Sequence, residues 1–198
     1  MVTAPLGEPL SAGVAHVAHP SSPRRLAINQ AGLWLFFFSE SFLFGALLAA
    51  RFYLAGAERP AHLNQLLGLG ITSILLLSSV TAYQSEAAIK QGQIGRCLAY
   101  LAATILLGLV FVAGVGVEWS TAEFGIAEPY GTAFFAMTGL HASHVVSGIG
   151  ILMLVYRLCR RGRFSKGRSW GVEAAVKYWH FVDVVWVFFY PALYLVSW

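Results

Sequence analysis

The chain has 198 residues, of which 58% are hydrophobic and 11% are charged, and its formal net charge is +4. A soluble domain carries about 25% charged residues, so this composition excludes an ordinary soluble globular protein and predicts a polytopic membrane protein. The basic residues gather in loops between long apolar runs, so the positive charge does not indicate nucleic acid as a partner.

A helix crosses a membrane with about 20 apolar residues, so we predict an all-α, polytopic bundle of five transmembrane helices. The spans are expected at about 31–54, 65–83, 98–117, 130–158 and 172–198, which together make one domain, residues 30–198. Residues 1–29 are expected to form a poorly ordered cytoplasmic tail. Its proline content and its lack of a continuous apolar core argue against a secretory signal.

Span one contains Glu40 about ten residues from its start, between Ser39 and Ser41. A carboxyl group at mid-membrane has to face protein or water, and we expect a protonated group in a dry site. Span two offers a small-residue pair, Gly68 and Thr72, and several hydroxyls, which we interpret as helix-packing groups. Span three is uniformly apolar, and its glycines predict close helix contacts.

Span four has two separate features on a helical wheel. Gly139, Ser143 and Ser147 recur every four residues and predict a close-packing ridge. His141 and His144 fall on another face, at a spacing that allows two imidazoles to bind one metal ion. We favour instead two buried histidines that bond to other helices or to lipid headgroups.

Span five holds Asp183 inside a run that is otherwise apolar and aromatic, with His180 one helical turn before it. The structural interpretation is a buried His–Asp hydrogen bond that packs the helix. The alternative is a proton-handling or metal-binding pair. The chain's two cysteines, Cys97 and Cys159, show no CxxC spacing, so neither a disulfide framework nor a thiolate metal site is suggested.

The distribution of basic residues predicts the orientation of the bundle. Eleven of the 13 lysines and arginines lie in the amino-terminal segment and in the loops that follow spans two and four, and only Arg51 and Arg59 lie on the other side. The positive-inside rule therefore places the amino terminus in the cytoplasm and the carboxyl terminus outside.

Four stretches resemble subunit III of the haem–copper oxidases, the cytochrome c oxidase subunit III family. They are GLWLFFFSE at 32–40, LLLSSVT at 75–81, YGTAFF at 130–135 with LHASHV at 140–145, and YWHFVDVVW at 178–186. The similarity covers residues 30–198 and is to the short, five-helix bacterial form.

The resemblance implies a non-catalytic subunit of an oxygen-reducing, proton-translocating complex of the aerobic respiratory chain. No catalytic, cofactor or metal residue is then expected in this chain, because haem and copper belong to subunits I and II. The subunit would pack on subunit I, bind phospholipid, and support complex stability and proton uptake in the bacterial inner membrane. The electron donor to the complex would be cytochrome c or a quinol. Glu40 matches the family's carbodiimide-reactive glutamate, and the resemblance implies lipid-contacting or structural roles for the buried polar residues Glu40, His141, His144, His180 and Asp183.

Other interpretations stay open at this point. Subunit III of a quinol oxidase and a subunit III-like partner of nitric oxide reductase share these motifs. A stand-alone membrane metalloenzyme would use Glu40, His141, His144, His180 and Asp183 as ligands. A transporter ranks last, because the sequence has no internal repeat and no pair of broken helices.

Overall fold

The computed structural model describes residues 23–56, 60 and 63–196. This part of the chain forms five α-helices and one short π-helix: α1 (Pro23–Ala55), α2 (Gln65–Lys90), α3 (Ile94–Thr121), α4 (Pro129–Arg160), α5 (Trp170–Tyr190) and η1 (Pro191–Leu195). Apart from one isolated antiparallel bridge between Ser165 and Arg168, the described residues contain no β-structure. The all-α class and the five helices predicted from the sequence are confirmed.

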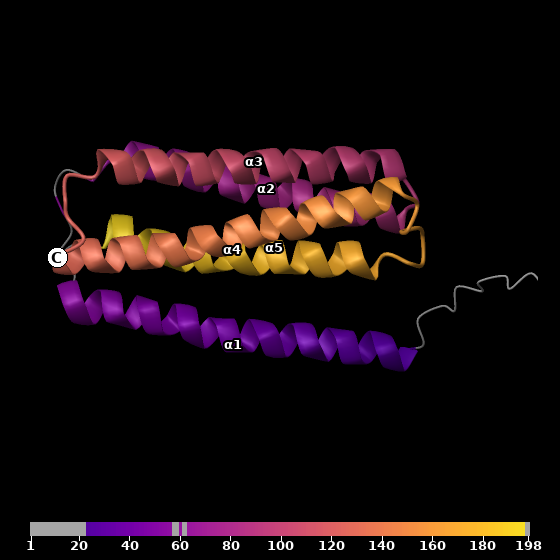
Figure 1. Ribbon diagram of the computed structural model, residues 1–198, viewed down its shortest axis with the longest axis horizontal. Helices are drawn as coiled ribbons and strands as arrows, with labels where there is room; N and C mark the ends of the chain where they lie inside the picture. The colour runs from indigo at the N-terminus through magenta and orange to yellow at the C-terminus, as the bar shows by residue number, and fades with distance from the viewer. Residues whose placement is uncertain (1–22, 57–59, 61–62, 197–198) are drawn as a thin grey trace, which may run out of the picture.

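The helices run side by side along the long axis of the molecule (Figure 1). Helix α3 packs against α2 and α4, while α5 packs against α4 and α2. Helix α1 lies along one side of this four-helix group and contacts α4 and α5. The amino-terminal helix is therefore the most peripheral element among those described.

Four of the described helices, α1 to α4, are long and apolar enough to cross a membrane. Helix α5 is shorter, at 21 residues, and carries Glu173, Lys177 and Asp183. It runs antiparallel to α4 within the same bundle, and η1 extends it toward the carboxyl terminus.

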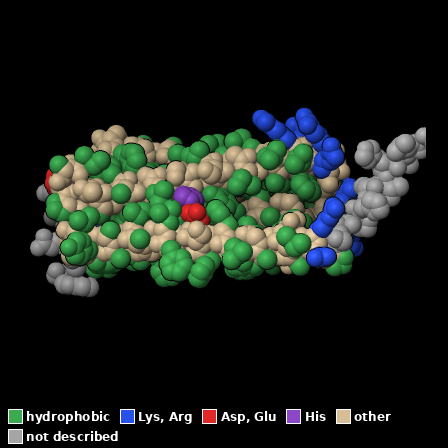
Figure 2. All heavy atoms as spheres, turned by 60° about the horizontal axis from the view of Figure 1, so that its bottom comes forward, with side chains coloured by type: hydrophobic (Ala, Val, Ile, Leu, Met, Phe, Trp, Pro, Cys, Tyr) green, Lys and Arg blue, Asp and Glu red, His purple; other side chains and the backbone are tan. Residues whose placement is uncertain are grey.

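Figure 2 shows hydrophobic side chains along the flank of the bundle and lysine and arginine side chains gathered at one end. Which end faces the cytoplasm stays a prediction.

The helices extend beyond the apolar stretches from which the spans were predicted. Helix α1 begins at Pro23 rather than near residue 31, so residues 23–29 of the expected tail are helical, whereas residues 1–22 lie outside the described part. Proline suits the first position of a helix, because no intrahelical donor is needed there. Helix α2 continues to Lys90 through polar residues, because its end depends on the turn that Gly92 makes at φ +78° rather than on hydropathy.

The backbone hydrogen-bonding pattern of the last helix changes from α to π at Pro191. Proline has no backbone N–H and cannot continue the α-helical bonding pattern. The last turn widens into η1, where the Val196 N–H donates to the Pro191 carbonyl oxygen at 3.0 Å, a spacing of five residues. This widened turn ends the helix and carries the buried side chain of Tyr194.

Trp179 of α5 fills the centre of the bundle. Its indole N–H donates to Ser78 Oγ of α2 at 2.9 Å. A Cβ atom on Gly108 of α3 would lie 2.6 Å from the indole ring, and one on Gly148 of α4 would lie 3.0 Å from it. The predicted close contact at the span-three glycine is thus made with an indole ring, which touches three other helices at once.

The ridge predicted on span four does not pack inside the bundle. Ser143 and Ser147 are exposed, and their hydroxyls donate to carbonyl oxygens of their own helix, those of Leu140 and Ser143. Gly139 alone faces a neighbouring side chain, that of Trp119. Within this chain only Gly139 of the ridge has a neighbour, so the close-packing role of the ridge stays a prediction: recurrence of small residues does not reveal which side of a helix has a neighbour.

We expect Gly108→Ala to destabilise the bundle, because the added methyl group would overlap the rigid, fully buried Trp179 ring. Overpacking of this kind costs about 1–3 kcal/mol, which should lower the melting temperature of the detergent-solubilised protein by several degrees. Gly116→Ala on the same helix is the matched control, because a Cβ there meets nothing within 4 Å. Equal melting temperatures for the two variants would contradict this account of the core.

Candidate functional site

The first polar cluster joins α1 to α4. The Glu40 Oε2 atom lies 3.2 Å from Nε2 of His144, and the two side chains are 19% and 16% exposed in the chain. Figure 2 shows acidic and histidine side chains in contact near the middle of one flank, with hydrophobic side chains around them. The sequence identified both residues as buried polar groups, and the structure brings them together across two helices.

The hydrogen bond at the other ring nitrogen of His144 limits where the protons of this pair can lie. Its Nδ1 lies 2.9 Å from the Leu140 carbonyl oxygen, which only accepts hydrogen bonds, so Nδ1 carries a proton. The Nε2 atom then either accepts the proton of a neutral Glu40 or donates, as part of an imidazolium, to a Glu40 carboxylate. In both cases one proton lies between α1 and α4. Tyr178 of α5 donates to the His144 carbonyl oxygen at 3.2 Å and so ties a third helix to the cluster.

The second polar cluster joins α2 to α5 through Ser79. The Ser79 hydroxyl donates to Asp183 Oδ2 at 2.5 Å, and its oxygen lies 2.7 Å from Nδ1 of His180. With its single hydrogen committed to the carboxylate, Ser79 accepts from a His180 Nδ1–H. The sequence predicted a direct His180–Asp183 hydrogen bond, and the structure corrects this to a bridge through a hydroxyl of another helix. Asp183 Oδ1 is buried and has no hydrogen-bond partner in the described part.

Further contacts extend this second cluster along the whole α2–α5 interface. The Trp186 indole N–H donates to Thr72 Oγ1 at 2.9 Å, as the Trp179 indole N–H does to Ser78. Nearer the carboxyl terminus, the Tyr194 ring lies against Gly68, whose Cβ would be 2.6 Å away. We call this series of contacts the hydroxyl–indole ladder. The small residues and hydroxyls of span two are packing groups as predicted, but their partners could not be identified from sequence.

His141 lies apart from both clusters. Its side chain is fully buried, neither ring nitrogen has a hydrogen-bond partner among the described residues, and aromatic rings surround it. The Trp186 ring centroid is 4.8 Å from that of His141, and the Phe111 centroid is 5.7 Å away. His141 therefore contacts α3 and α5, whereas His144 contacts α1, so the two imidazoles do not converge. Within the described ranges, no group of three or more histidine, cysteine, aspartate or glutamate side chains is placed to hold a metal ion.

Two polar side chains at the end of the bundle where the chain's carboxyl terminus lies, Glu118 and Arg51, were not identified as buried from the sequence. Both carboxylate oxygens of Glu118 lie 2.7 Å from the Tyr194 hydroxyl, which donates to the carboxylate. Arg51 is fully buried, donates to the Gly56 carbonyl oxygen at 2.8 Å, and lies 4.8 Å from the Tyr130 ring centroid. The packing of distant segments buries both side chains.

The sequence model of the family described as Cytochrome c oxidase subunit III matches residues 25–198. The chain belongs to the cytochrome c oxidase subunit III family.

Several animal proteins are similar to this chain. Cytochrome c oxidase subunit 3 of Coturnix japonica is 35% identical over 176 residues, that of Artemia franciscana is 39% identical over 176 residues, and that of Danio rerio is 38% identical over 178 residues. Each alignment covers 82% of this chain and 67% of the relative. The resemblance inferred from the four sequence motifs is thereby confirmed. The roles of the five polar site residues in this subunit III chain stay predictions.

We expect Ser79→Ala to destabilise the protein, because it leaves the buried Asp183 carboxyl group without its Ser79 partner and removes the acceptor for His180. Loss of a partner for a buried polar group costs about 1–3 kcal/mol. Ser73→Ala is the control, because Ser73 is exposed on the same helix and donates only to its own Leu69 carbonyl oxygen. Thermal unfolding in detergent measures both. If Ser79→Ala melted no lower than Ser73→Ala, the Ser79 bridge would contribute nothing to stability.

Proposed function

We propose that this chain is the non-catalytic subunit III of a terminal haem–copper oxidase in a bacterial inner membrane. It packs on subunit I, binds phospholipid, and supports the stability of the complex and its proton uptake. The observation that carries the proposal is the family match over residues 25–198. The electron donor to the complex is cytochrome c or a quinol, and haem and copper belong to subunits I and II.

The arrangement of the polar groups supports a structural role more than a redox role. The Glu40–His144 pair and the Ser79 contacts to His180 and Asp183 join helices to each other, and the candidate ligands of a metalloenzyme are divided among separate places. Glu40 and His144 join α1 to α4, His180 and Asp183 meet Ser79 of α2, and His141 lies among aromatic rings. The role in proton uptake comes from the family resemblance.

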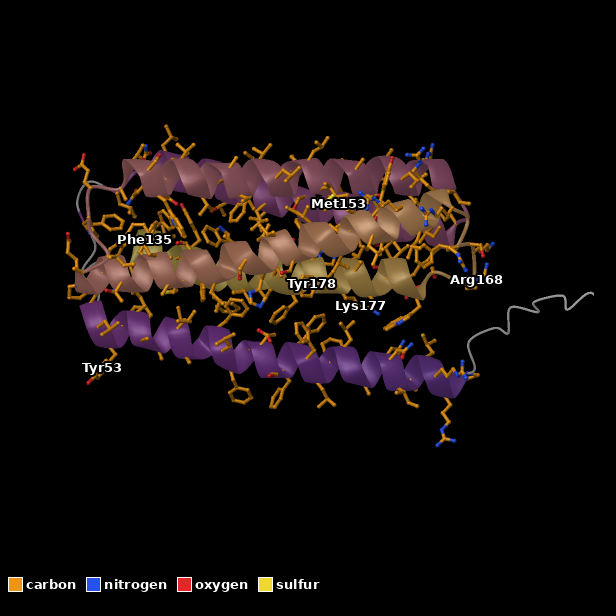
Figure 3. All side chains as sticks on the ribbon, viewed as in Figure 1. Tyr53, Phe135, Met153, Arg168, Lys177 and Tyr178 are labelled. Atoms are coloured by element: carbon orange, nitrogen blue, oxygen red, sulfur yellow. The ribbon has the colours of Figure 1, made fainter. Side chains whose placement is uncertain are left out.

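Two cavities, both lined by residues of α1 and α5, support phospholipid binding. An apolar groove of about 890 Å³ runs between α1 and α5 and is lined by Trp34, Phe38 and Phe181 among others, with Lys177 at its edge. Figure 3 shows Lys177 and Tyr178 on the side of α5 that faces α1. The groove is long, apolar and open on the side, which fits an acyl chain.

A second cavity, of about 260 Å³, continues along the same two helices toward the basic end of the bundle. Its polar lining includes Asn29 and Gln30 of α1, Arg163 and Arg168 of the loop between α4 and α5, and the Glu173 carboxyl group of α5. Arginine recognises phosphate oxygens through several N–H donors. We assign the phosphate of one anionic phospholipid to this cavity and its acyl chain to the apolar groove between the same two helices.

Co-purification tests the proposed function. A tagged chain extracted in mild detergent is expected to bring with it a larger haem-bearing chain and oxygen-reducing activity. After the partners are stripped away, the remaining polypeptide should show no haem absorbance and consume no oxygen. If the isolated polypeptide still consumed oxygen or carried its own redox centre, the chain would be an enzyme in its own right and the proposal would be wrong.

The lipid assignment has its own test. We expect the double variant Arg163→Gln, Arg168→Gln to retain several-fold less phosphatidylglycerol than the wild-type complex, as measured by native mass spectrometry. Arg161→Gln is the control, because Arg161 is exposed in the same loop and does not line the cavity. Equal retention by the double variant and the control would show that the cavity does not hold the phosphate.

A further inference from the structure

One half of the seam between α2 and α5 carries ionisable side chains, and the second polar cluster includes only two of them. On each helix they recur every three or four residues, which places them on one side of that helix. They are Tyr83, Glu86 and Lys90 of α2 and Glu173, Lys177, His180 and Asp183 of α5. In the other direction, α5 has no titratable side chain before Tyr190, and residues 65–82 of α2 contain none. The ionisable groups therefore lead from Asp183 toward the basic end of the bundle and not toward the other end.

Contacts at both ends of this half-seam fix how the two helices face each other. At the inner end, the Ser79 hydroxyl donates to Asp183 Oδ2 at 2.5 Å. At the outer end, Lys90 Nζ lies 2.5 Å from Glu86 Oε1 and 4.0 Å from Glu173 Oε2. Helices α2 and α5 run antiparallel (Figure 1), so the residues between these two contacts lie opposite one another.

The burial of these groups increases along the half-seam. The Lys90 side chain is 52% exposed, and those of Glu86 and Glu173 are 16% and 19% exposed. His180 is partly exposed and lines the apolar groove, whereas Asp183 is only 3% exposed. A proton from solvent therefore meets ionisable groups of decreasing exposure on the way from the basic end to Asp183.

His180 and Ser79 have the geometry of a proton relay to this carboxyl group. His180 Nδ1 donates to the Ser79 oxygen at 2.7 Å, and the Ser79 hydroxyl donates onward to Asp183 Oδ2. With the hydrogen of the neutral ring on Nδ1, Nε2 has a lone pair, and it makes no hydrogen bond within the described part of the chain. Histidine can accept a proton at one ring nitrogen and release one from the other, which is how it shuttles protons in proteins.

We propose that His180, Ser79 and Asp183 form a one-sided proton relay that carries a proton from the basic end of the bundle to Asp183. A proton binds at His180 Nε2, the Nδ1–H bond breaks as that proton moves to Ser79 Oγ, and the Ser79 hydroxyl proton moves to Asp183 Oδ2. One proton enters and none is lost. His180 ends neutral with its hydrogen on Nε2, Asp183 ends as a neutral acid, and both hydrogen bonds persist with their directions reversed.

The surroundings of Asp183 explain why a proton is held there. A carboxylate is costly inside a membrane, and Asp183 Oδ1 is buried without a hydrogen-bond partner among the residues described. Ionisable groups of the surrounding helices are engaged elsewhere. Glu40 and His144 bond to each other, and Glu118 of α3 bonds to the tyrosine of η1. His141 lies among aromatic rings. The inference uses groups of this chain alone, so it does not rest on the proposed function.

Infrared spectroscopy of the full chain, in the complex with which it purifies, follows the proton on Asp183 directly. The carbonyl band of a protonated carboxyl group shifts on exchange into heavy water, and Asp183→Asn identifies the band by removing it. Should that variant fail to assemble, Asp183→Glu identifies the band by displacing it. We expect His180→Gln to slow the exchange of this band about tenfold or more, because only transient opening of the seam then admits solvent. Glutamine can still bond to Ser79 but cannot shuttle a proton, whereas Ser79→Thr keeps the hydroxyl and should exchange like the wild type.

The direction of the change separates a relay from a structural contact. A variant that merely loosened the seam would exchange faster and not slower. If His180→Gln left the exchange rate unchanged or raised it, or if no protonated carboxyl band responded to the Asp183 variants, the relay would be refuted.

Two variants at opposite ends of the bundle test the side of entry. Glu86→Gln, at the basic end, should slow the exchange several-fold because it removes an ionisable group of the half-seam. Glu128→Gln is the matched control, because Glu128 is exposed at the opposite end, just before α4. Equal exchange rates in these two variants would show that protons do not enter along the half-seam, and the one-sided relay would be overturned.

Discussion

The hydroxyl–indole ladder between α2 and α5 is the interaction on which the rest of the bundle depends. Within a membrane, helices gain little from burying apolar surface against each other, so close packing and hydrogen bonds between helices have to specify the arrangement. Two indole N–H groups of α5 and one of its carboxylates find their partners in α2 hydroxyls. Because Trp179 also packs against Gly108 and Gly148, fixing α5 on α2 fixes α3 and α4 as well.

Helix α1 is attached in a different way. Its described residues are mostly exposed, and it meets the other helices through a few aromatic contacts and the Glu40–His144 pair. The Phe37 and Phe181 rings stack at 4.8 Å between the centroids, and beyond that contact the apolar groove opens between α1 and α5. The same loose attachment that leaves α1 at the periphery thus creates the space that we assign to a phospholipid.

Two buried side chains of this bundle have fewer hydrogen bonds than is usual. Among the residues that the structure describes, His141 has no hydrogen-bond partner at either ring nitrogen, and Asp183 has none at Oδ1. An uncompensated buried polar atom is costly, yet each of these side chains also makes other contacts: His141 lies against Trp186 and Phe111, and the other oxygen of Asp183 is bonded to Ser79. Their placement is consistent with residues that hold helices in register and not with a set of converging ligands.

The sequence by itself determined the helical membrane class, the number of helices and the family, because long apolar runs and local motifs such as YWHFVDVVW lie within single segments. It also singled out Glu40, His144, His180 and Asp183, since ionisable residues are rare in such runs. Only the tertiary structure decided their partners: Ser79 is more than 100 residues from Asp183, and Glu40 is more than 100 residues from His144. Periodicity gives the faces of a helix, but it cannot say which face meets a neighbour, and that choice placed Ser143 on the surface and Glu118 inside.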